Sequence, residues 1–262
     1  MRLIDVHSHL EWPDFKGKLG GVKERANANN VIAAISSSVM AKSAQEVLDI
    51  QKEFKGFIFA CCGFAPAEFK KHPQSVEDFI KFSKDHADEF LALGEIGLDY
   101  YWIKDKDTRD LAERRFIELL NLADTLNKPI VIHCRDAEEK TIQLIEENFQ
   151  GDKVHMHCFS GPPDLIKRGL KNGWMFSVPT SVVSRKYHQR LADTVPIDRM
   201  MLETDSPFLS PLRGEKRNEP KNIAISAKFI ANMKKVNLEE FAESTTQNAI
   251  DFYSLKNKIR ID

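Results

Sequence analysis

The 262-residue chain contains few cysteines and no long hydrophobic runs. Its four cysteines, Cys61, Cys62, Cys134 and Cys158, form no C-x-x-C pair, which excludes zinc-ribbon and thioredoxin-type motifs. No stretch approaches the roughly 20 apolar residues of a membrane-spanning helix, and no apolar run of signal-peptide length lies near the first residue. We therefore expect a cytoplasmic protein with reduced cysteines and no association with membranes.

An excess of charge of one sign is also missing. The chain has 38 Lys and Arg against 39 Asp and Glu, a net charge of −1. This balance excludes a broad basic surface that holds nucleic acid or lipid by charge alone, so an anionic partner would need a local site. With 42% hydrophobic and 29% charged residues, the composition is that of a folded globular protein.

Eight short apolar runs alternate with amphipathic segments of helical spacing along the whole chain. The runs are residues 3–9, 31–37, 57–63, 91–96, 129–134, 153–159, 174–179 and 199–204. Eight strand–helix units predict a (β/α)8 TIM barrel, an α/β fold with its active site at the C-terminal ends of the strands. We expect one such domain over residues 1–262. A doubly wound open sheet also alternates strands and helices, and alternation alone does not distinguish the two folds. Within this pattern, Ser43 and Glu46 fit a capping box at a helix start.

Polar side chains interrupt several of the predicted strands. Strands of a parallel barrel are buried on both faces and are expected to be almost wholly apolar. The exceptions lie toward the C-terminal ends of the runs: Asp5, His7, His9, Glu95, His133, Arg135, His155, His157, Glu203 and Asp205. Since strand side chains alternate between faces, His7 and His9 share one face. In a barrel these groups would converge on one mouth.

Burying so many ionisable groups without compensation is costly. Imidazoles and carboxylates are natural ligands of Zn²⁺, Mn²⁺ or Mg²⁺, so a pair of divalent ions would offset the cost. The alternative is a hydrogen-bonded polar core without metal, in which Glu95 pairs toward the helices. We expect His155, which lies deeper, to be packed or hydrogen-bonded, and His72, His86 and His188 to be surface residues. Cys134 and Cys158 directly follow histidines and are expected to face the helices as inert thiols.

Six short motifs follow one another in order: IDVHSHL at 4–10, GEIGLDY at 94–100, IHCR at 132–135, HCFSG at 157–161, LETDSP at 202–207 and RNEP at 217–220. In this ordered set, which spans nearly the whole chain, the sequence resembles the TatD-like deoxyribonucleases, a family of metal-dependent hydrolases. The resemblance implies a TIM barrel that binds two or more divalent ions. By position it implies the ligands His7, His9, Glu95, His133, His157 and Asp205, with Glu95 bridging the ions.

Two positions depart from the family pattern. His155 stands where the family usually has an apolar residue, so either His155 or His157 is the ligand from this strand. His72 lies where many relatives place a Gly-x-His-Pro element, which makes it a second candidate for the mouth of the barrel. Glu203, like His155 and His72, is a candidate site residue of second priority.

We expect the following reaction and substrate contacts at this site. Metal-activated water attacks phosphorus, and Asp205 and Glu95 act at the reaction centre. Arg135 holds a phosphate oxygen or forms a salt bridge with Asp136 or another nearby acidic residue. The rings after Glu95 stack on bases or pack on a neighbouring loop; they belong to Tyr100, Tyr101 and Trp102. A basic loop binds phosphate or is merely solvated; it contains Arg213, Lys216 and Arg217.

We therefore predict a metal-dependent deoxyribonuclease that acts on single strands or ends, with DNA as substrate and no obligate protein partner. One alternative is a hydrolase of a small amide, ester or phosphoester on the same centre, since fold does not determine function. Another is a binding module without activity, against which the complete ligand set argues.

Overall fold

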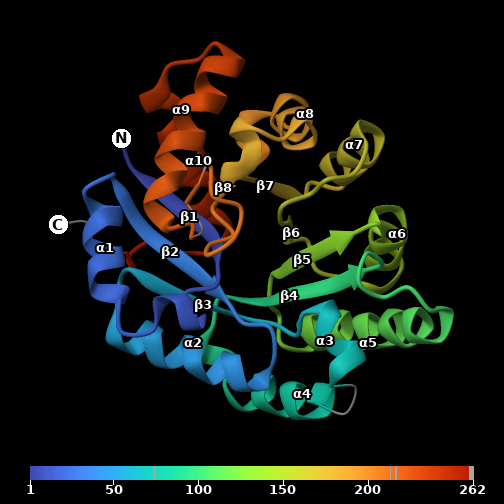
Figure 1. Ribbon diagram of the computed structural model, residues 1–262. Helices are drawn as coiled ribbons and strands as arrows, with labels where there is room; N and C mark the ends of the chain where they lie inside the picture. Colours follow the sequence, from blue (N-terminus) through green and yellow to red (C-terminus); the bar gives the residue numbers. More distant parts are fainter. Residues whose placement is uncertain (73–74, 213, 216, 260–262) are drawn as a thin grey trace.

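The computed structural model describes residues 1–72, 75–212, 214–215 and 217–259. Eight parallel strands form one sheet whose spatial order follows the chain order, as Figure 1 shows. They are β1 (Leu3–Ser8), β2 (Val31–Ser37), β3 (Ile58–Cys62), β4 (Ala92–Asp99), β5 (Ile130–Arg135), β6 (Val154–Met156), β7 (Met175–Pro179) and β8 (Met200–Glu203). All eight predicted strands and the TIM barrel are confirmed, and the doubly wound alternative is wrong because that fold does not order its strands consecutively.

The first and last strands meet and close the barrel. The backbone N–H of Asp205 donates to the carbonyl of His7 at 2.9 Å, and that of His9 donates to the carbonyl of Ser206 at 2.7 Å. Residues about 200 positions apart in the sequence are thereby held on neighbouring backbones. Closure therefore brings His7 of β1 and His9, which directly follows this strand, next to Asp205.

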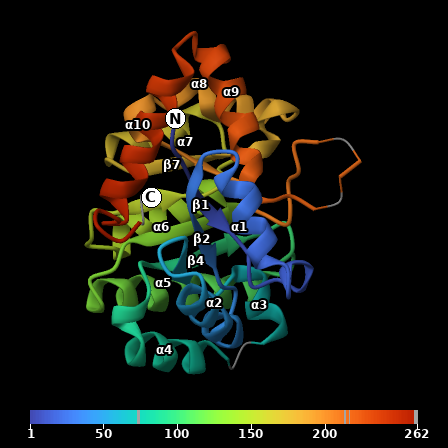
Figure 2. The same cartoon turned by 90° about the vertical axis from the view of Figure 1, so that its left-hand side faces the viewer.

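Helices surround the barrel on the outside (Figures 1 and 2). They are α1 (Leu19–Asn27), α2 (Ala41–Glu53), α3 (Pro66–Lys71), α4 (Ser75–Asp85), α5 (Lys106–Thr125), α6 (Glu138–Asn148), α7 (Pro163–Lys171), α8 (Lys186–Thr194), α9 (Ile223–Lys234) and α10 (Leu238–Phe252). Short 3-10 turns are η1 (Pro13–Phe15), η2 (Ala87–Glu89), η3 (Thr180–Val183), η4 (Ile197–Arg199) and η5 (Pro220–Asn222). Within the described residues, no helix is both long and apolar enough to cross a membrane.

The start of α2 differs from the predicted capping box. The helix begins at Ala41, so Ser43 is its third residue rather than its cap. The hydroxyl of Ser43 accepts from the backbone N–H groups of Val39 and Met40, at 3.0 and 3.1 Å. The serine thus accepts hydrogen bonds from otherwise unpaired N–H groups although it lies inside the first turn. The sequence pattern alone does not distinguish this contact from N-capping.

Two apolar clusters hold the fold. One fills the space between strands and helices and includes Phe64, Phe116 and Phe176. The other lines the lower interior of the barrel with one or two side chains from every strand except β6, such as Ile35 and Met201, and is closed by the end of α10. The polar groups at the upper ends of the strands therefore stand on a rigid apolar floor.

Register shifts in β1 and β4 decide which polar residues face inward. The pairing of β1 with β2 shifts between Asp5 and Ser8, and that of β4 with β5 shifts between Leu93 and Ile96. Without such a shift, strict alternation would place Glu95 on the face of Leu93, which packs toward the helices. An extra residue in one strand re-aims the side chains that follow it, and here the shift turns Glu95 into the barrel.

Candidate metal centre

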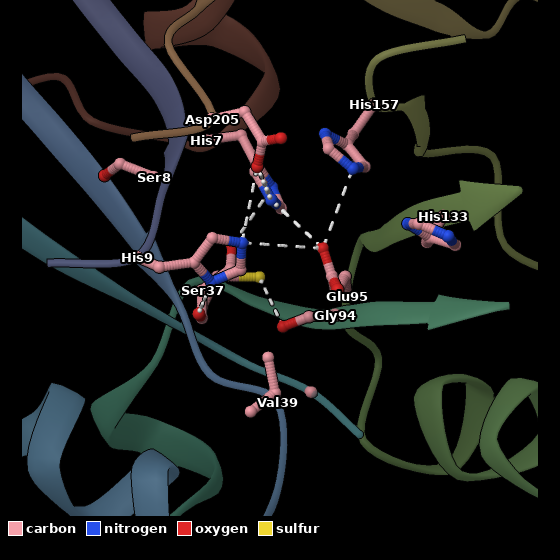
Figure 3. Close-up of polar contacts among 12 residues, drawn as sticks. His7, Ser8, His9, Ser37, Val39, Gly94, Glu95, His133, His157 and Asp205 are labelled. Atoms are coloured by element: carbon pink, nitrogen blue, oxygen red, sulfur yellow. Dashed lines mark hydrogen bonds and ion pairs between the residues drawn. The ribbon is translucent and has the colours of Figure 1, made fainter. Parts of the chain in front are cut away.

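Side chains from β1, β4, β6 and β8, or from residues just after these strands, converge on one another, as Figure 3 shows. Glu95 lies at their centre: its Oε2 is 3.1 Å from Nε2 of His7, 3.6 Å from Nε2 of His157 and 3.9 Å from Nε2 of His9. Asp205 approaches from the β8 side, with Oδ1 3.4 Å from Nε2 of His9 and 3.8 Å from Nε2 of His7. Three imidazoles thus present the same ring nitrogen to two carboxylates.

Ser37 at the end of β2 orients the rings of His7 and His9. Its hydroxyl lies 3.2 Å from Nδ1 of His7, and its carbonyl oxygen accepts from Nδ1 of His9 at 2.8 Å. The ring of His157 stacks on that of His7 with 3.8 Å between centroids. The contacts with Ser37 occupy Nδ1 of His7 and of His9 and leave Nε2 of both rings directed at the carboxylates.

The donor set fits divalent metal ions. Nε2 of His7 is buried and has no hydrogen-bond partner within the described structure, although Glu95 is close. A buried polar atom without a partner is costly, and a metal ion would satisfy it. Three groups of His and Glu have ligand atoms within 4.8 Å of one another: His7, His9 and Glu95; Glu95, His133 and His157; and His7, His157 and Glu203. Glu95 belongs to two of them, as a bridging ligand would.

The charges of the cluster oppose one another strongly. Burial raises the pKa of the Glu95 carboxyl, but contact with His7 and the charge of His9 outweigh it and hold that pKa well below its ordinary value. Burial lowers the pKa of His9, yet its bond with Asp205 raises it to about 10. Burial also lowers the pKa of His157, but the charge of Glu203 outweighs this effect and the pKa rises to about 9. The carboxyl group of Glu95 is therefore ionised and can bind a cation.

His133 lies at the edge of the cluster. Its side chain is 24% exposed, and its Nε2 is 3.0 Å from Oδ2 of Asp99. Asp99 is buried at the end of β4 and was missed in the sequence. That strand runs three residues further than predicted because Gly97 to Asp99 continue to pair with β5. A polar residue four positions after Glu95 was the signal that could have indicated it.

His155 belongs to a chain of buried hydrogen bonds below the centre. Its Nδ1 lies 2.6 Å from the hydroxyl of Tyr253, and its Nε2 lies 2.5 Å from the hydroxyl of Ser177. Ser177 donates to Oε2 of Glu203 at 2.5 Å, and Nδ1 of His157 lies 3.1 Å from the same oxygen. Among the described residues, His155 is in none of the three possible ligand groups, whereas His157 is in two.

A cleft of about 530 Å³ opens above the centre. Its lining includes Arg135 and Trp102 on one side. The guanidinium of Arg135 lies over the ring of Tyr101, 3.7 Å from its centroid. Arg135 has no ion pair with Asp136 within the described structure. Both rings are open to solvent, with Tyr101 41% and Trp102 59% exposed.

Other candidate contacts are placed elsewhere. Tyr100 donates to Glu113 at 2.5 Å and carries Arg109 on its ring, so it packs against α5 instead of facing the cleft. Arg217 is occupied by Glu219 at 2.9 Å and by the carbonyl of Asp14 at 3.0 Å.

Three other candidate residues lie away from the cleft or outside the described residues. His72 is exposed, 3.8 Å from Glu68, and is not among the residues that line the cleft. Arg213 and Lys216 lie outside the described residues.

The prediction that His188 is a surface residue is wrong. It is 1% exposed on the inner face of α8, where Leu191 and Ala192 follow at helical spacing and are also buried. Its Nδ1 lies 2.8 Å from the hydroxyl of Ser181, and its Nε2 lies 3.5 Å from Sγ of Cys158. Cys158 is half-buried and lines the cleft, contrary to expectation, because its left-handed backbone (φ 47°) turns the chain after His157.

Comparisons with known proteins agree with this geometry. The model of the family described as TatD related DNase matches residues 4–254. A human protein named deoxyribonuclease TATDN3 is 33% identical over 261 residues, covering 96% of this chain and 94% of its own. The uncharacterized metal-dependent hydrolase YabD of Bacillus subtilis is 33% identical over 252 residues, covering 94% and 97%.

Solved structures show the same fold. The TatD homolog YJJV of Escherichia coli superposes with a TM-score of 0.86 at 23% identity, covering 97% of this chain and 98% of its own. A TatD family hydrolase of Entamoeba histolytica gives 0.85 at 22% identity with the same coverage. From the ordered motifs, the closed barrel and the family match over nearly all of its length, the chain belongs to the TatD-related DNase family of metal-dependent hydrolases.

Proposed function

We propose that the chain hydrolyses phosphodiester bonds of DNA, at single strands or at ends, as one catalytic domain. The observation that carries this proposal is the pairing of Glu95 and Asp205 with histidine nitrogens at the floor of a cleft whose rim presents Arg135 and exposed aromatic rings. A human relative that is 33% identical is named a deoxyribonuclease, which supports DNA as the substrate.

The same residues would hold the metal. Two or more divalent ions, Zn²⁺, Mn²⁺ or Mg²⁺, would be bound by His7, His9, Glu95, His133, His157 and Asp205, with Glu95 shared between them. Bound metal supplies activated water and neutralises charge that develops on the phosphoryl group. Glu203 and Ser37 contact ring nitrogens that face away from Glu95, so they fix the direction of the imidazoles.

Asp205 is suited to orient the attacking water. Its side chain is 17% exposed whereas that of Glu95 is 9% exposed, so Asp205 reaches further toward the cleft. Only its Oδ1 is engaged by the histidines, at 3.4 and 3.8 Å. The second oxygen can accept a hydrogen bond from water and hold its proton as the oxygen attacks phosphorus.

Arg135 and the neighbouring rings would bind the strand. A guanidinium offers a fork of donors that matches two oxygens of a phosphate. Stacking of bases on rings such as Trp102 is worth about 1–3 kcal/mol per base and tolerates any base. A recessed site among loops admits an exposed strand or end more readily than the interior of a duplex.

The test is digestion of end-labelled single- and double-stranded DNA with Mg²⁺, Mn²⁺ or Zn²⁺. We expect Glu95→Ala and His157→Ala to lower cleavage at least about 100-fold, the size of effect seen when key catalytic donors are removed. His86→Ala is the matched control, because His86 bonds Glu89 outside the cleft. Undiminished cleavage in both site variants contradicts the site. Hydrolysis of a small ester with none of oligonucleotides contradicts DNA as substrate and favours the alternative hydrolase.

A further inference from the structure

The part of the cleft wall that follows β7 carries a cation that the proposed function does not yet use. Arg185 directly precedes α8, and it lines the cleft together with Tyr187 and His188 of that helix. Arg135 follows β5 and Arg185 follows β7, so the two arginines stand on either side of the segment that leaves β6. That segment bears His157.

Arg185 is held in place without being neutralised. Its Nη1 donates to the hydroxyl of Tyr187, and the guanidinium carbon lies 5.8 Å from the centroid of that ring. Arg185 is exposed, and within the described part of the chain no carboxylate lies at ion-pair distance from it. A guanidinium has five N–H donors, so one bond to a hydroxyl leaves most of them free.

The other charges of the cleft are already engaged. The acidic residues that line it are Glu95, Asp99 and Asp205, and each faces a histidine. His188 behind the wall is buried, which lowers its pKa to about 3 and leaves its ring uncharged. Arg185 is therefore the charged group of this part of the cleft wall. Like the guanidinium of Arg135, its guanidinium lies near a tyrosine ring.

Resting on the proposed deoxyribonuclease function, we propose that Arg185 binds a non-reacting phosphate of the DNA strand while Arg135 contacts the phosphate at the centre. Two oriented guanidiniums that line one cleft match a chain with repeated phosphates, because each fork pairs with two oxygens of one phosphate. The arrangement selects oligonucleotides over esters that carry a single phosphate.

The experiment compares two substrates in the metal-loaded protein: a thymidine octamer and bis(4-nitrophenyl) phosphate, a diester with one phosphate. For Arg185→Gln, we expect the ratio of kcat/KM on the octamer to kcat/KM on the small ester to fall about tenfold, mainly through KM. The slope of log kcat/KM against log salt for the octamer should become shallower by about 0.7, the value for one contact to a single strand.

Two further variants make the result specific. Arg190→Gln removes an exposed arginine of α8, the helix that Arg185 precedes. Arg190 is not among the residues that line the cleft, so this variant should preserve both the ratio and the slope. Arg185→Lys keeps a point charge but not the fork, so it should restore the salt slope and only part of the ratio. Circular dichroism confirms that each variant is folded.

The outcomes separate the two proposals. If Arg185→Gln lowers both substrates equally, or changes neither ratio nor slope while the wild type cleaves the octamer, the phosphate subsite is wrong and the nuclease function stands. The same effect from Arg190→Gln would show a general surface charge and also overturn the subsite. If the wild type hydrolyses the small ester but no oligonucleotide, the proposed nuclease function itself is wrong.

Discussion

Hydrogen bonds around Glu203 determine which nitrogen of His157 carries a proton. Ser177 donates its hydroxyl proton to Glu203, so it accepts from Nε2 of His155. Tyr253 must then donate to Nδ1 of His155. The oxygen of Glu203 that accepts from Ser177 also lies next to Nδ1 of His157, so in the neutral form that binds metal this ring keeps its proton on Nδ1 and its Nε2 lone pair faces Glu95. A buried network thus sets the tautomer that metal binding requires.

Removing this acceptor should weaken metal binding. We expect Glu203→Ala to lower metal affinity about 10–100-fold, the usual effect of losing a carboxylate that orients a ligating histidine. Glu203→Gln keeps one acceptor oxygen and should lose less. Competition with a chromophoric chelator measures the affinity without reference to activity. Equal affinity of Glu203→Ala and wild type would show that Glu203 does not orient the ligand.

At the scale of elements, the close approach of β4 to β5 builds the centre. Gly97 pairs with His133 and has φ of 143°, a conformation that other residues rarely adopt. A Cβ placed there would lie 1.9 Å from the carbonyl oxygen of His133. Glycine at this position lets β4 run on to Asp99, which contacts the His133 ring.

Gly97→Ala should therefore destabilise the protein by about 3 kcal/mol or more, from backbone strain and overpacking together. Gly20→Ala is the matched control, because nothing lies within 4 Å of a Cβ on that exposed position of α1; it should be neutral or stabilising by up to about 1 kcal/mol. Chemical denaturation measures both free energies of unfolding. Equal effects would contradict the steric argument.

The buried imidazole of α8 adds a pH dependence. Burial, aided by the charge of Arg185, lowers the pKa of His188 from 6.5 to about 3. The unfolded chain takes up this proton below pH 6.5 and the folded chain does not, so stability falls by up to about 1.4 kcal/mol per pH unit as pH drops from 6.5 toward 3. His188→Gln should show a shallower loss of unfolding free energy between pH 7 and 5. An unchanged pH dependence would contradict this pKa shift.

For the whole molecule, closure of the barrel concentrates buried charge that no single strand contains. His7 and Asp205 are neighbours only because β1 and β8 join, and Glu95 reaches them across the interior. A group that binds only the folded state stabilises it. A metal ion bound by these residues would therefore stabilise the fold as well as supply chemistry.

Removal of metal should lower the melting temperature. At 100 times its Kd, a ligand of the folded state contributes about 2.7 kcal/mol, which corresponds to about 5–10 °C in a chain of this size. We expect a chelator to cause this loss and added metal to reverse it, as scanning calorimetry would measure. Glu95→Ala should lose the metal-dependent shift and His86→Ala should keep it. A melting temperature that does not respond to chelator in the metal-loaded wild type would contradict the metal centre.

Periodicity predicted the strands well because strand burial is a local property of the sequence. It was less informative for side chains whose direction depends on distant partners. Glu95 faces inward through a register shift against β5, and Asp99 belongs to β4 only because that pairing continues. His188 is buried because α8 turns it toward Cys158. Arg217 is occupied by Glu219 and by the backbone of Asp14, about 200 residues away in the chain.

The eight alternating units, the polar residues at strand ends and the ordered motifs of a metal-dependent hydrolase can all be recognised from the sequence alone. These depend on local burial and on residue type, which periodicity and composition report. Three outcomes depend on the folded structure: which nitrogen and oxygen atoms face one another, which of His155 and His157 points at Glu95, and which arginines are left without an ion pair. Those outcomes arise from closure of the barrel and from pairing register, which join residues far apart in the chain.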